Sequence, residues 1–130
     1  MRRNVFLIVL ALLTLIACQP KMGSRVDTSN LSVFFLQGVD KEKAIAFAEY
    51  WRDNGFVGER KQTIQLDRDG EVILVKLIEN ERFHEELINI SEEAMLQQIE
   101  RDLKRNVFQQ EVEIIITDNT LRPLLKRKNI

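Results

Sequence analysis

The chain has 130 residues, a formal net charge of −1 at pH 7, and 45% hydrophobic residues. This length suits one domain with a hydrophobic core of its own. The near-neutral charge argues against a nucleic-acid-binding protein, which would present a basic face. The single cysteine excludes an internal disulfide, so the domain must be stabilised by packing.

The start of the chain combines positive charge, an apolar run and the lone cysteine. Arg2 and Arg3 precede the largely apolar residues 5–15, and Ala17 stands directly before Cys18. This is the three-part layout of a secretory signal peptide. The run is too short for a stable transmembrane helix, which needs about 20 apolar residues.

Residues 15–18 read LIAC, which resembles the lipobox of bacterial lipoproteins. The resemblance covers residues 1–18. It implies that residues 1–17 are removed, that a diacylglycerol alkylates the thiol of Cys18, and that the new N-terminus is acylated as well. Two or three acyl chains anchor a protein stably to a membrane. Because Gln19 stands where an aspartate commonly retains Gram-negative lipoproteins at the inner membrane, we expect an outer-membrane protein that faces the periplasm.

Residues 18–30 are expected to form the lipidated cysteine and a flexible tether. The stretch after the cysteine reads QPKMGSRVDTSN and shows no apolar period. Twelve such residues would span roughly 20 Å as a random coil, from about 5–6 Å × √n. The tether would therefore keep the domain close to the bilayer.

Residues 31–117 are predicted to form the folded domain, followed by a basic tail at 118–130. Alternating or β-branched runs predict strands at 31–37, 63–66, 71–79 and 112–117. Apolar residues at helical spacing predict one helix from the N-cap Asp40 to Asn54-Gly55, and a second from Ser91 to about Val107.

The order strand-helix-strand-strand-helix-strand predicts an α+β domain. Right-handed crossovers favour the ferredoxin-like split βαβ arrangement. In that arrangement a four-stranded antiparallel sheet of order 4-1-3-2 carries both helices on one face. Because this fold hosts many functions, it does not name one.

Alternation along the strands predicts a stripe of large apolar residues on the sheet face away from the helices. Monomers rarely expose large apolar patches, so we expect something to cover the stripe. The alternatives are the tail through Leu121, Leu124 and Leu125, a second protomer, an envelope protein partner, or an apolar ligand. The candidate interaction face consists of Phe34, Leu36, Val72, Leu74 and Ile115.

No residue pattern predicts catalysis, a metal or a cofactor. Asp67-x-Asp69-Gly70 resembles part of a calcium loop, but Lys76 stands where such a loop needs a glutamate, so a hairpin turn is the better interpretation. His84 is the only histidine, and one imidazole is a poor basis for a zinc site.

The sequence therefore predicts a membrane-anchored envelope lipoprotein that acts as a protein-binding or scaffolding module. Two alternatives stay open. One is a small-ligand or glycan-binding lipoprotein that uses the open sheet face, and the other is a hydrolase that relies on carboxylates. An enzyme or small-ligand site would be a concave pocket with convergent polar groups, whereas a scaffold would show a flat apolar patch.

Overall fold

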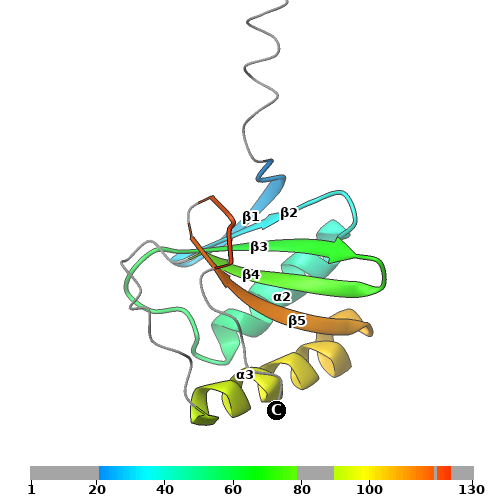
Figure 1. The fold of residues 1–130 in the computed structure, drawn as a ribbon. Coiled ribbons are helices and arrows are strands. Elements are labelled where there is room, and N and C mark those ends of the chain that lie inside the picture. The colour runs from blue at the N-terminus through cyan, green and yellow to red at the C-terminus, as the bar shows by residue number, and fades with distance from the viewer. Residues whose placement is uncertain (1–20, 79–89, 119, 124–130) are drawn as a thin grey trace, which may run out of the picture.

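The computed structural model describes residues 21–78, 90–118 and 120–123. Cys18, His84, Leu124 and Leu125 lie outside the described residues. Five strands form one sheet with two helices packed on it (Figure 1). The elements in chain order are β1 (Ser24–Thr28), β2 (Leu31–Phe35), α2 (Lys41–Asp53), β3 (Gln62–Asp69), β4 (Val72–Ile78), α3 (Ile90–Leu103), the π-helical turn η1 (Lys104–Phe108) and β5 (Glu111–Thr117).

The α+β class is confirmed, but the predicted strand order and the all-antiparallel pairing are wrong. The strands lie in chain order, β1-β2-β3-β4-β5. β1 pairs with β2 and β3 with β4 in antiparallel fashion, whereas β2 pairs with β3 and β4 with β5 in parallel. The sheet is therefore mixed, with one helix in each parallel crossover.

The additional strand β1 explains why the order differs. It lies within residues 18–30, which were expected to be a flexible tether, and it occupies the edge of β2 where the last predicted strand was expected. Ser29, with φ of 49°, and Asn30 form the two-residue turn between the strands. Val26 is the only large apolar residue in β1, so its alternation is too short to stand out in the sequence.

Helix α2 has the ends that the sequence predicts. Asp40 is its N-cap and Asn54 its C-cap. Gly55, with φ of 77°, donates its N–H to the carbonyl of Arg52, and Phe56 donates to the carbonyl of Trp51. These two bonds form a Schellman motif. The rings of Trp51 and Phe56 lie 4.8 Å apart, so the helix end is tied into the core.

Helix α3 turns most of its predicted stripe inward. Leu96, Ile99, Leu103 and Val107 are buried, whereas Met95 is 53% exposed because it lies on the flank of the stripe. The π-helical turn η1 continues directly from α3. Its wider turn lets two consecutive residues, Val107 and Phe108, both reach the core.

Alternation along the strands also predicts which strand residues face the helices, and the structure confirms this side. The strand register places them on one face of the sheet, and most are buried in a single core with residues of α2, α3 and η1. Residues of α2, α3 and η1 share this core, so both helices lie on the same face of the sheet. The two parallel crossovers step across the sheet in the same direction, but β4 and β5 run antiparallel to β2 and β3. One of the two crossovers is therefore left-handed, against the usual preference. The helix-facing strand residues are Leu31, Val33, Phe35, Ile64, Leu66, Ile73, Val75, Leu77, Val112, Ile114 and Ile116.

Candidate functional site

The sheet face away from the helices, here called the open face, carries all five residues of the candidate interaction face. Phe34 and Leu36 come from β2 and its end, Val72 and Leu74 from β4, and Ile115 from β5. Each is partly buried. None of them is among the large hydrophobic residues of the described chain that are strongly exposed.

The strand order divides these five residues into two groups. β3 lies between β2 and β4 and turns Thr63, Gln65 and Asp67 toward the open face. Phe34, Gln65, Lys76 and Ile115 lie in one row across the sheet. The predicted order would have placed β3 at an edge and joined the apolar residues into one stripe. We name the two groups the β2 cluster (Phe34 and Leu36) and the β4–β5 cluster (Val72, Leu74 and Ile115).

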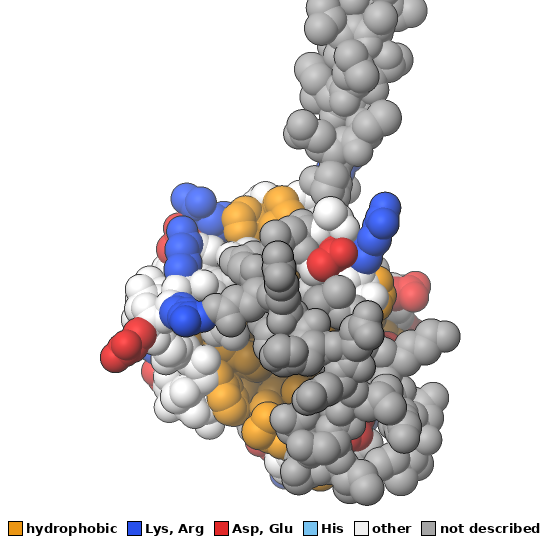
Figure 2. Space-filling view, turned by 60° about the vertical axis from the view of Figure 1, so that its left-hand side comes forward, with side chains coloured by type: hydrophobic (Ala, Val, Ile, Leu, Met, Phe, Trp, Pro, Cys, Tyr) orange, Lys and Arg blue, Asp and Glu red, His pale blue; other side chains and the backbone are white. Residues whose placement is uncertain are grey.

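In Figure 2, hydrophobic side chains reach the surface in one patch near the top of the domain, beside Lys and Arg side chains, and in another patch lower down. The open face therefore combines two apolar clusters with a polar centre.

The chain enters the domain across the open face. The Nε2 amide of Gln65 donates to the backbone carbonyls of Lys21, at 3.0 Å, and Met22, at 3.1 Å. Gln65 is fully buried, although it lies on the face away from the helices. The segment of residues 21–23, here called the entry segment, therefore lies over the centre of this face. The prediction that the tail covers the face involves Leu124 and Leu125, which lie outside the described residues.

Gly23 lets the entry segment turn from the open face into the edge strand. Its φ is 93°, and a Cβ atom at this position would lie 2.3 Å from the carbonyl oxygen of Phe35. No other residue avoids both the backbone strain and this clash. Gly23 is therefore the one residue in the sequence that indicates the entry segment. Its role becomes clear only when the structure places it against Phe35 at the end of β2.

Charged and polar groups on the open face are paired within the domain. Lys76 Nζ lies 3.3 Å from Asp67 Oδ2, and both side chains are largely shielded, at 17% and 27% exposure. Between β1 and β2, at the edge of the sheet, the hydroxyl of the buried Ser32 donates to Asp27 at 2.7 Å. The Oε1 atom of Gln65 is buried and accepts no hydrogen bond from the described residues.

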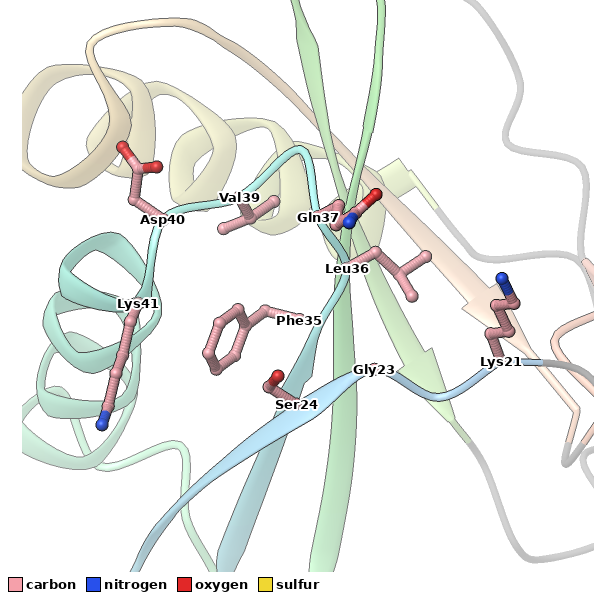
Figure 3. A pocket seen from close by; sticks show the side chains of 9 residues that line it. All are labelled: Lys21, Gly23, Ser24, Phe35, Leu36, Gln37, Val39, Asp40 and Lys41. Atoms are coloured by element: carbon pink, nitrogen blue, oxygen red, sulfur yellow. The ribbon is translucent and has the colours of Figure 1, made fainter.

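A groove of about 820 Å³ lies where the entry segment meets the end of β2 and the start of α2. Figure 3 shows Phe35 pointing toward α2 and Leu36 pointing the opposite way, toward Lys21. Ser24, Gln37, Asp40 and Lys41 also line it. Figure 3 shows the polar ends of Lys21, Asp40 and Lys41 lying apart from one another.

The remaining candidate motifs are structural where the structure describes them. Asp69 pairs with Val72 across a two-residue turn in which Gly70 has φ of 60°, which confirms the predicted hairpin. Within residues 21–78, 90–118 and 120–123, no three or more His, Cys, Asp or Glu side chains are grouped as metal ligands.

The described start of the tail stays beside the end of β5. Thr117 forms an isolated antiparallel bridge with Pro123. The Asp118 carboxylate accepts hydrogen bonds from the N–H groups of Thr120 and Arg122 and from the Thr120 hydroxyl. These hydrogen bonds, that of the Thr120 hydroxyl first, lower the pKa of Asp118.

Comparison of the chain with protein-family models, with curated proteins and with solved structures gives no match. Among the helices of the described residues, none has both the length and the apolar character needed to cross a bilayer.

Proposed function

We propose that the chain is a lipid-anchored envelope protein that binds a protein partner close to the bilayer surface. Cys18 carries the lipid, and the domain faces the periplasm from the outer membrane. Its role is binding or scaffolding and requires no catalytic group. The observation that carries the proposal is the contact of Gln65 with the entry segment, because it determines how far the domain stands from Cys18.

The anchor and the domain are closely spaced. Gln65 holds the chain from Lys21 onward, so three peptide steps separate the lipidated cysteine from a fixed point on the domain. An extended chain covers about 3.3–3.6 Å per residue, which limits this distance to about 11 Å. The open face, from which the entry segment leaves, is then presented next to the headgroups.

The open face offers the binding surface. Its two apolar clusters flank the centre of the face, over which the entry segment lies. A protein partner can cover both clusters at once and contact the entry segment between them, whereas a small ligand would contact only one. Interfaces typically combine such an apolar core with polar contacts.

The anchor is tested by intact-mass spectrometry of the full-length protein from its native host. We expect a chain that begins at Cys18 and carries a diacylglycerol and an amide-linked acyl group. Replacement of Cys18 by alanine should release the protein from the membrane fraction. A product that still begins at Met1, or a free thiol at Cys18, would contradict the anchor.

The binding surface is tested by cross-linking and affinity purification of the lipidated protein from envelope. Phe34→Asp and Leu74→Asp each place a charge in one cluster, and we expect each to remove the same copurifying protein. Met95→Asp makes a matched change on the exposed side of α3 and should retain it. An unchanged set of copurifying proteins in both open-face variants, with the fold intact by circular dichroism, would disprove this function.

A further inference from the structure

The two edges of the sheet differ in how they are protected. At β5, the backbone N–H of Ile114 donates to the Glu100 carboxylate at 2.8 Å, and Thr117 bridges to Pro123. At the other edge, β1 pairs with β2, and within the described residues no strand pairs with its outer side (Figure 1). An open edge strand presents unpaired backbone groups that can receive another strand.

We propose that β1 pairs antiparallel with β1 of a second copy of this chain, with Val26 at the two-fold axis. β1 reads SRVDT, and this sequence is complementary to itself when it runs in the opposite direction. Val26 meets Val26 of the second copy, each Arg25 meets an Asp27, and each Ser24 meets a Thr28. Apolar, opposite-charge and hydroxyl pairs are the favourable cross-strand combinations.

The charges are available for this exchange. Arg25 Nε and Asp27 Oδ2 lie 3.1 Å apart within one chain, and their side chains are 55% and 54% exposed. Their register with Phe34 and Ser32 places both on the open face, so in the dimer they meet their counterparts on the same side of the joined sheet. Val26, which packs against the core, meets its counterpart on the helix side.

Other registers of the same strand are disfavoured. A pairing centred on Arg25 places two arginines opposite each other, and a pairing centred on Asp27 does the same with two aspartates. Like charges directly opposite destabilise a strand pair. Charged residues on an edge strand normally prevent it from pairing with another strand. Arg25 and Asp27 therefore disfavour pairing with strands of other sequence, but they allow β1 to pair with a second β1.

The arrangement also agrees with anchoring in one bilayer, although the pairing itself does not require the anchor. A two-fold axis through Val26 and perpendicular to the sheet leaves both open faces on the same side of a ten-stranded sheet. The entry segment lies on the open face of each copy, because Gln65 holds it there. Both chains therefore leave toward the same membrane, and the two copies are concentrated on its surface.

Disulfide cross-linking of the full-length protein in its own membranes tests the pairing. Opposite Cα atoms in an antiparallel pair lie about 4.5–5.5 Å apart, which suits a disulfide. We expect Val26→Cys to give at least tenfold more covalent dimer than the unsubstituted chain. The unsubstituted chain is the control for any cross-linking through Cys18. Glu111→Cys, at the opposite edge of the sheet, should give no increase. Equal cross-linking of the two variants would overturn the proposal.

Charge reversal tests the register. In the Val26→Cys background, Arg25→Asp places like charges opposite each other on both sides of the axis and should lower cross-linking at least tenfold. Asp27→Arg should do the same. When these two variants are produced together with different tags, every charged pair is again opposite in sign, so cross-linking between the tags should return.

Recovery of cross-linking between the two tagged variants also shows that both variants are folded. If Arg25→Asp cross-links as well as its parent, or if the mixed pair does not recover, the Val26-centred pairing is wrong. If only the lipid anchor were wrong, the mass of the protein would show it, and the effects of the charge reversals on cross-linking would be unchanged. Failure of the anchor and failure of the strand pairing are therefore distinguishable.

Discussion

The side-chain amide of Gln65 holds the backbone carbonyl of Lys21 at 3.0 Å across 44 positions of sequence. This hydrogen bond lies on the sheet face away from the helices, and it makes the entry segment part of the domain. The domain therefore begins at least ten residues before the first strand that the sequence predicts.

Replacement of Gln65 by leucine should release the entry segment. Leucine cannot donate to the carbonyls of Lys21 and Met22, and the loss of these two part-buried hydrogen bonds, at about 0.5–1.5 kcal/mol each, costs about 1–3 kcal/mol in all. We expect the free energy of unfolding in urea to fall by this amount. Faster amide hydrogen exchange in β1, with little change in β4, would show that the effect starts at the entry segment.

Replacement of Gly23 by alanine should destabilise the same region for a steric reason. The added Cβ would meet the carbonyl oxygen of Phe35 at a positive φ, and such substitutions cost more than about 1 kcal/mol. Gly58→Ala is the matched control, because nothing lies within 4 Å of its Cβ position and its φ is not positive. Thermal melts of the two variants should differ clearly, and equal melting temperatures would contradict the close approach.

Replacement of Asp67 by asparagine should weaken the ion pair with Lys76 on the open face. Asparagine retains the oxygen that accepts from the Arg68 N–H but removes the negative charge beside Lys76. Because this pair is shielded, we expect a loss of about 1–2 kcal/mol in urea unfolding. Asp53→Asn removes an exposed partner of Arg52 and should cost less than about 0.5 kcal/mol. Equal losses of unfolding free energy in the two variants would contradict the expectation that shielding from solvent strengthens the Asp67–Lys76 pair.

Tyr50 should make the fold sensitive to alkaline pH. Burial, with the neighbouring Asp102 carboxylate, raises the pKa of Tyr50 above its ordinary value of 10.0. The unfolded chain therefore loses this proton first, and stability falls as the pH rises past 10.0 toward the folded pKa. Since Tyr50 is the only tyrosine, tyrosinate absorbance reports it alone. Unfolding of Tyr50→Phe should depend less on pH in this range, and an unchanged dependence would refute the assignment.

The candidate site was partly predictable. Alternation alone placed Phe34, Leu36, Val72, Leu74 and Ile115 on one face, because side chains on a strand point to opposite faces in turn. It could not show that β3 lies between β2 and β4. The same alternation puts Gln65 on this face, but its role depends on the entry segment, which lies more than 40 residues away in sequence.

The sequence by itself determined the helices, four of the five strands and the inward side of each, because these depend on periodicity and capping within a few residues. Asp40 and Gly55 mark the ends of α2 in this way. Only the tertiary structure decided the strand order, the addition of β1 and the division of the open face. Pairing between distant strands depends on the competition among all edges for partners, and no local pattern records its outcome.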